Sequence, residues 1–202
     1  GGRADQRKHV EAGFHFRLVL QQGVIALRAQ GPARLAIGKL ASRRNDVWEM
    51  QTWEDFENKV NDFACALLAK GLSKGASVAI LAGNVPGWTI VDIAAIAAGG
   101  VGVGIYPTSS PAQCEYIIKH SDAEFVIVDT VTQRAKITEF ANVKEVICIE
   151  DGTFAEFLKY GRENLDAFLP QVEQIGINAD PEDIAIMVYT SGTTGEPKGA
   201  ML

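Results

Sequence analysis

Short apolar runs that alternate with helical patterns are the feature that most constrains how this sequence can fold. Five runs have the length of buried strands and are bounded by turn residues; they cover residues 78–81, 101–106, 124–129, 145–149 and 184–189. Strands that alternate with helices favour parallel pairing through crossover connections. The sequence therefore predicts an α/β fold with a mostly parallel sheet flanked by helices on both faces.

The segments between these runs carry helix start and stop signals. Thr52 with Asp55 and Ser110 with Gln113 have the spacing of a capping box, and Pro111 stands at a first helical position. We expect helices over residues 53–70, 86–98, 111–121, 131–140 and 153–158. Residues 161–181 give no strong pattern, so we expect an irregular or weakly helical connection there.

Residues 1–50 differ from the rest of the chain in charge. They carry nine Lys and Arg against four Asp and Glu, a net +5, whereas the remainder carries −11. An Arg-rich start is typical of a targeting arm, a membrane-surface segment or a solvated basic face, and the near absence of serine favours the solvated face. Peripheral membrane association stays an open alternative. We expect a short strand over residues 33–39 and a polar turn over residues 43–46.

The same patterns divide the chain into three parts. We predict an N-terminal entry segment over residues 1–50 and an α/β subdomain over residues 51–182. Residues 183–202 are expected to form a strand and a loop that open a next, truncated subdomain.

Composition excludes several classes of protein. The net charge of −6 argues against nucleic-acid binding. The three cysteines lie far apart, which excludes a disulfide framework and indicates reduced core thiols of a cytoplasmic protein. The longest uncharged apolar stretch, residues 93–106, has 14 residues including four glycines, too few for a membrane span. Gly100, Gly102 and Gly104 alternate within it and predict close packing of a helix on a strand.

The stretch after the last predicted strand carries the chemistry. It reads Tyr189-Thr190-Ser191-Gly192-Thr193-Thr194-Gly195-Glu196-Pro197-Lys198-Gly199. Glycines let backbone N–H groups converge on an anion, the hydroxyls add donors, and Lys198 adds a positive charge. A Walker A loop is excluded because Pro197 precedes the lysine and Gly199 follows it. The stretch predicts a polyphosphate site, with a flexible surface turn as the alternative.

This loop resembles the phosphate-loop signature of the acyl-adenylate-forming, or AMP-binding, enzyme superfamily. Residues 51–56 and 97–107 are similar to two motifs that precede the loop in that family. Residues 84–88 and 104–111 most resemble the long-chain fatty acyl-CoA synthetase branch, bubblegum-type members included. The resemblance covers roughly residues 31–202 and is most specific in the last loop.

The resemblance implies an ATP-dependent long-chain fatty acid–CoA ligase. A fatty acid and ATP would give acyl-AMP and pyrophosphate with Mg2+ present, and CoA would then take the acyl group as a thioester. The residues implied to hold the ATP phosphates are Thr190, Ser191, Gly192, Thr193, Thr194, Gly195 and Lys198. Thr190 is also the candidate ligand for Mg2+, and no catalytic residue is predicted within the chain.

The family's adenine, ribose and Mg2+-glutamate motifs, and its C-terminal lysine, follow the loop. We therefore expect this chain to be an N-terminal portion that is inactive without the C-terminal part of its own chain. Two alternatives remain: an adenylate-forming enzyme for aryl or amino acids, and a non-catalytic nucleotide-binding or interaction module.

Other polar residues give weaker signals. His9, His15 and His120 are too scattered for a metal site and are expected at the surface or in local caps. Tyr106 fits either a ligand crevice or packing at a strand end. We expect Asp129 to act as a cap or turn residue, and Glu196 to face solvent because a carboxylate would repel phosphate.

Overall fold

The computed structural model describes residues 39–44, 47–138, 141–190 and 197–202, with side chains from Met50 onward. The chain divides into two compact units. The first contains the residues up to Asn58 together with Asn178–Asp183, and the second contains Lys59–Ile177 and Ile184–Leu202. The division into three parts stays a prediction.

In the first unit, strands β1 (Lys39–Arg44) and β2 (Val47–Thr52) form an antiparallel ladder. Helix α3 (Trp53–Ala69) follows directly. Asp55 N donates to Thr52 Oγ1 at 3.0 Å, and Thr52 N donates to Asp55 Oδ2 at 3.1 Å, which confirms the capping box.

Two predictions concern the residues around β1. The predicted turn over residues 43–46 is wrong for Arg43 and Arg44, because both pair with β2 and so continue β1. Residues 45–46 lie outside the described residues. Most of the strand predicted over residues 33–39 also lies outside them.

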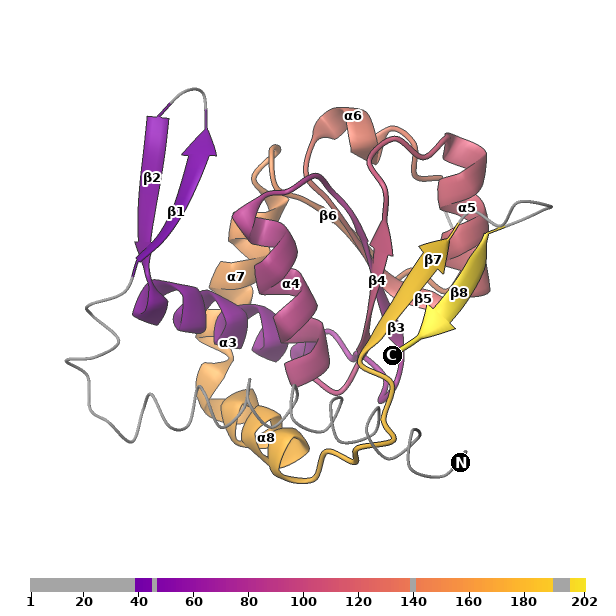
Figure 1. The fold of residues 1–202 in the computed structure, drawn as a ribbon. Helices are drawn as coiled ribbons and strands as arrows, with labels where there is room; N and C mark the ends of the chain where they lie inside the picture. The colour runs from indigo at the N-terminus through magenta and orange to yellow at the C-terminus, as the bar shows by residue number, and fades with distance from the viewer. Residues whose placement is uncertain (1–38, 45–46, 139–140, 191–196) are drawn as a thin grey trace, which may run out of the picture. The chain divides into compact units, whose positions relative to one another are not determined.

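The second unit is built on a sheet that contains six strands within the described part of the chain. They are β3 (Ser77–Leu81), β4 (Val101–Ile105), β5 (Ala123–Val128), β6 (Glu145–Cys148), β7 (Ile186–Thr190) and β8 (Lys198–Met201). Their order is β6-β5-β3-β4-β7-β8, and every pair is parallel except β7 with β8. The predicted fold class is confirmed (Figure 1).

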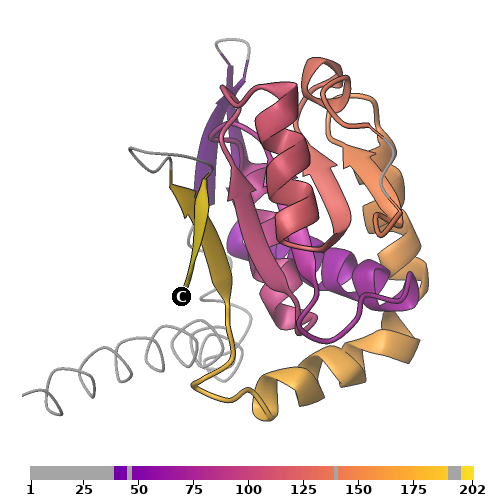
Figure 2. The same cartoon turned by 90° about the vertical axis from the view of Figure 1, so that its right-hand side faces the viewer.

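Helices cover both faces of this sheet (Figures 1 and 2). They are the later turns of α3 together with α4 (Pro86–Ala97), α5 (Pro111–His120), α6 (Val131–Arg134), α7 (Thr153–Glu163) and α8 (Leu165–Ile177). Successive strand residues point to opposite faces. Val126 packs in the core beneath α5, whereas Phe125 faces Phe157 of α7 across 6.2 Å between ring centroids.

Glycines let α4 lie close to the strands, as predicted. A Cβ on Gly100 would be 3.3 Å from the carbonyl oxygen of Ala95 in α4, and a Cβ on Gly102 would collide with Asp92 Oδ1. The cysteines also behave as predicted: Cys65, Cys114 and Cys148 are buried and free.

Two helix predictions need correction. The helix predicted over residues 131–140 ends at Arg134, and Lys136 turns its side chain to the carbonyls of Pro107 and Ser109. The helix predicted to end at residue 158 continues to Glu163.

The connection expected over residues 161–181 contains the ordered helix α8, which spans Leu165–Ile177. Pro170 lies inside it and weakens the local helix signal, because proline lacks the amide donor. Packing overrides this propensity: Val172 is buried, and Ile175 reaches Gly99 at the end of α4.

Candidate functional site

The predicted loop follows β7 at the carboxyl edge of the parallel strands. Open α/β sheets bind ligands at this edge, because the strands end there together and their connecting loops line it. Strand β7 lies beside β4 in parallel, so Thr190 at the end of β7 lies at the same sheet edge as the segment that follows β4. Thr190 ends β7, Lys198 begins β8, and the two are partners in the antiparallel ladder. The structure thus brings together the two ends of the predicted loop.

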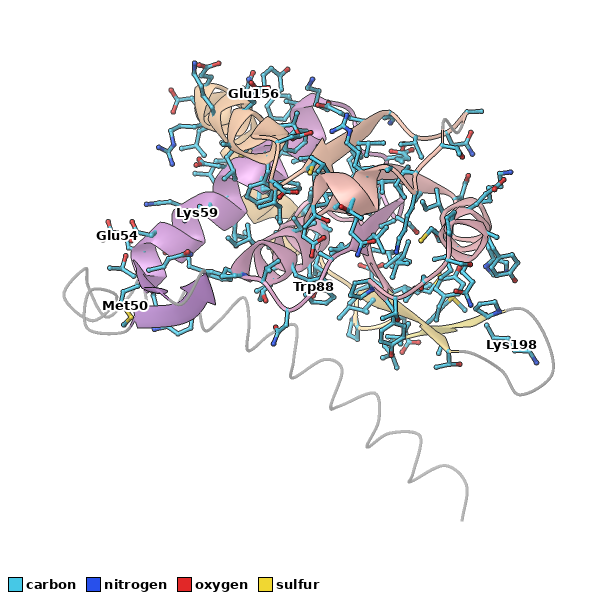
Figure 3. All side chains as sticks on the ribbon, turned by 90° about the horizontal axis from the view of Figure 1, so that it is seen from above. Met50, Glu54, Lys59, Trp88, Glu156 and Lys198 are labelled. Carbon is cyan, nitrogen blue, oxygen red and sulfur yellow. The ribbon has the colours of Figure 1, made fainter. Side chains whose placement is uncertain are left out.

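Both of these side chains are accessible. Thr190 and Lys198 are exposed, and Figure 3 shows Lys198 reaching past the ends of the two strands. Ser191, Gly192, Thr193, Thr194 and Gly195 lie outside the described residues, as does Glu196.

The chemistry of these two groups suits a phosphate. A hydroxyl and an ammonium group donate hydrogen bonds to phosphate oxygens. Mg2+ prefers carboxylates and the phosphates of its substrate, so Thr190 would supply at most one neutral oxygen. Within the described ranges, no group of three His, Cys, Asp or Glu residues could hold a metal ion.

Tyr189 and Gly199 support the hairpin from which the loop extends. They are partners in the β7–β8 ladder, one position before Thr190 and one after Lys198. Tyr189 is buried, and a Cβ on Gly199 would lie 3.2 Å from its Cζ and 3.0 Å from Met187 Sδ. Burial, with a further contribution from nearby Tyr116, raises the pKa of the Tyr189 hydroxyl. Glycine at position 199 therefore leaves room for the Tyr189 ring over β8.

The segment that follows β4 is anchored by side chains that the sequence analysis missed. Lys136 Nζ donates to the carbonyl oxygens of Pro107 and Ser109 at 2.8 and 2.9 Å, and Gln133 Nε2 donates to the Pro107 carbonyl at 3.1 Å. These contacts hold the backbone directly after Tyr106, whose side chain is 66% exposed at the edge. No local pattern could have indicated them, since the partners are 26 to 29 residues apart.

A second contact links the turns after β3 and β5. Gly83 N donates to Asp129 Oδ2 at 2.8 Å, so Asp129 is a turn residue, as predicted. Polar side chains directly after β5 and around α6 therefore hold the loops of this edge in place.

Comparison with known proteins finds similar sequences over most of the chain. A family model described as "AMP-binding enzyme" matches residues 28–202. Long-chain-fatty-acid–CoA ligase ACSBG2 of Xenopus laevis is 32% identical over 176 residues, which are 81% of this chain and 23% of that protein. Long-chain-fatty-acid–CoA ligase ACSBG1 of Homo sapiens is 34% identical over 176 residues, 81% of this chain and 24% of that protein. The chain thus spans about a quarter of the length of these relatives.

Solved structures share the fold. The N-terminal domain of FACL13 from Mycobacterium tuberculosis, bound to an inhibitor, matches with a TM-score of 0.62 and 26% identity over 78% of this chain and 38% of that chain. ATP-bound MatB from Rhodopseudomonas palustris matches with a TM-score of 0.61 and 24% identity over 76% of this chain and 30% of that chain. In the parts of this chain that the structure describes, no helix is long and apolar enough to cross a membrane.

Proposed function

Since this chain belongs to the AMP-binding enzyme family, we propose that it is the N-terminal, phosphate-holding part of an ATP-dependent long-chain fatty acid–CoA ligase. The observation that carries this proposal is the pairing of Thr190 with Lys198 at the base of the loop, at the carboxyl edge of the sheet. The ligase names of the relatives support the fatty acid as substrate.

The proposed reaction has two steps. A carboxylate oxygen of the fatty acid bonds to the α-phosphorus of ATP, and the bond from that phosphorus to the bridging oxygen breaks, so that the electron pair leaves with pyrophosphate. The sulfur of CoA then bonds to the acyl carbon as its thiol proton is released, and the bond from that carbon to the phosphate oxygen breaks, so that the electron pair leaves with AMP.

The loop would act on the first step. Backbone and hydroxyl donors of residues 190–195 would hold the phosphates, and Lys198 would offset the negative charge that gathers on the departing pyrophosphate. Mg2+, when bound, would neutralise further phosphate charge, and Thr190 is the residue of this chain that would face it. No residue of the chain is proposed to form a covalent bond with substrate.

The partners follow from this chemistry. They are ATP, CoA, a fatty acid and the C-terminal portion of the enzyme, without nucleic acid. We propose a cytoplasmic location, in which peripheral contact with a membrane would bring the enzyme to its fatty acid. Without the C-terminal portion, the chain is proposed to be inactive.

The test is acid-dependent exchange of labelled pyrophosphate into ATP, measured on the full-length native protein. Lys198→Ala should lower kcat/KM for ATP by about a hundredfold, the usual effect of losing one donor to developing charge. Lys159→Ala is the matched control, because Lys159 is exposed on α7 and lies 3.8 Å from Glu163, its ion-pair partner.

A panel of acids tests the substrate class. Long-chain fatty acids should support exchange, whereas benzoate and amino acids should not. Exchange with an aryl or amino acid alone would contradict the fatty-acid assignment, and an unchanged rate in Lys198→Ala would contradict the role of the loop.

A further inference from the structure

We propose that His120 is a positioning residue for the phosphate loop, acting through the hydroxyl of Tyr189. This inference rests on the proposed function of the loop and adds to it a residue from a different element. His120 Nδ1 and Tyr189 Oη are 2.8 Å apart, although the residues are 69 positions apart in the sequence. Tyr189 directly precedes Thr190, the first residue proposed to hold phosphate.

The ring of His120 is held in place by two aromatic neighbours. It stacks on Tyr116, four residues earlier on α5, with 5.4 Å between ring centroids and 27° between planes. It meets Tyr189 edge to face, with 5.7 Å between centroids and 87° between planes. His120 is exposed at the end of α5, and these two ring contacts orient its Nδ1 toward Tyr189, so the hydrogen bond requires little further ordering.

The hydrogen bond reaches both strands of the hairpin. Tyr189 is 3% exposed in β7, and its Cζ, the ring carbon that carries the hydroxyl, lies against Gly199 of β8. Since Tyr189 and Gly199 are ladder partners, one contact with α5 fixes the strand that enters the loop and the strand that leaves it. A set of donors binds phosphate well only when its supporting strands hold it in the binding geometry.

The proposed role of His120 is to position the hairpin, not to stabilise the fold. The core under α5 contains many buried apolar side chains, including Ile117, Ile118 and Val126, which do not depend on His120. Loss of the hydrogen bond should therefore leave the fold intact and loosen the hairpin at its loop end. We expect the affinity for ATP to change more than the stability of the protein without ligand.

The test measures MgATP affinity by calorimetry and the Tm with and without MgATP, on the full-length native protein. His120→Ala and Tyr189→Phe should each weaken MgATP binding by about fivefold, the effect of losing one neutral hydrogen bond. The double variant should bind no more weakly than either single variant, because both remove the same interaction. His120→Asn, whose amide can approach the position of Nδ1, should restore part of the affinity. Tyr160→Phe on α7 is the matched control.

The outcomes separate this inference from the proposed function. If Lys198→Ala weakens MgATP binding while His120→Ala and Tyr189→Phe lower only the Tm without ligand, His120 is a structural residue and the inference is wrong. Additive losses in the double variant would also overturn it. If the unsubstituted protein does not bind MgATP, the proposed function itself fails, and the positioning role fails with it.

Discussion

A buried carboxylate lies between α4 and β4. Asp92 is 8% exposed, and its Oδ1 occupies the space that a side chain on Gly102 would need. Burial raises the pKa of Asp92 from 3.8 to about 6, because the charged form loses its hydration. A folded-state pKa above the unfolded value means that the folded chain binds the proton more tightly. The stabilisation is complete below about pH 4 and is lost as the pH rises through 6.

The raised pKa of Asp92 predicts how the stability of the protein changes with pH. Asp92→Asn keeps the shape and removes the charge, so its unfolding free energy relative to the unsubstituted protein should rise by about 2 kcal/mol between pH 4 and pH 7.5. Urea unfolding at both pH values measures the difference. In the control Asp166→Asn, exposed on α8, the same difference should stay below about 1 kcal/mol. Equal pH profiles for Asp92→Asn and the unsubstituted protein would contradict the burial argument.

At the scale of elements, the contact between α3 and α7 is close enough to require a glycine. A Cβ on Gly161 would overlap the carbonyl oxygen of Asp62. Near Gly161, the ring centroids of Phe63 and Phe157 are 4.7 Å apart. Arg162 Nη2 also donates a hydrogen bond to Asp62 Oδ2 at 2.6 Å. Tight packing and an ion pair to a buried carboxylate therefore join the two helices at one place.

Gly161→Ala tests this contact, because replacing glycine by alanine usually stabilises a helix, whereas here it should destabilise the protein. In an open helix the change stabilises by about 1 kcal/mol, whereas here the forced separation of two helices should destabilise by about 3 kcal/mol. Urea unfolding measures the change. Ala155→Gly, at an exposed position of the same helix, should cost only about 1 kcal/mol and sets the scale. A stabilised Gly161→Ala variant would show that α3 and α7 are not in close contact.

At the scale of the whole molecule, we propose that the chain supplies the phosphate-holding side of the site. It spans about a quarter of the length of its relatives, and the family resemblance implies that the adenine, ribose and Mg2+ motifs follow the loop. A loop that binds phosphates stabilises the departing charge but does not bring the carboxylate of a fatty acid to the α-phosphorus.

The 202-residue chain by itself should therefore show no fatty-acid-dependent pyrophosphate exchange above background, whereas the full-length native protein should. The assay compares equal molar amounts of the two, each with and without fatty acid. Exchange by the short chain would mean that it contains the groups for adenylation, and the assignment of no catalytic residue to it would be wrong.

The sequence by itself determined the elements whose signals are local. Capping boxes at Thr52 and Ser110 formed as predicted, because their partners stand three residues away. Short apolar runs indicated the buried strands, and the stretch from residue 189 to residue 199 indicated the family. These signals need no knowledge of the rest of the chain, since each arises within one turn, one strand or one loop.

The tertiary structure decided what depends on distant neighbours. Contacts between distant segments set the strand order and place β8 antiparallel to β7. Packing also maintains helix α8, where Pro170 weakens the local helix propensity. The contacts of Lys136 with Pro107 and of His120 with Tyr189 join residues 29 and 69 positions apart. A hydrogen bond forms between groups that the fold brings within reach, and only the complete sheet with its helices sets those positions.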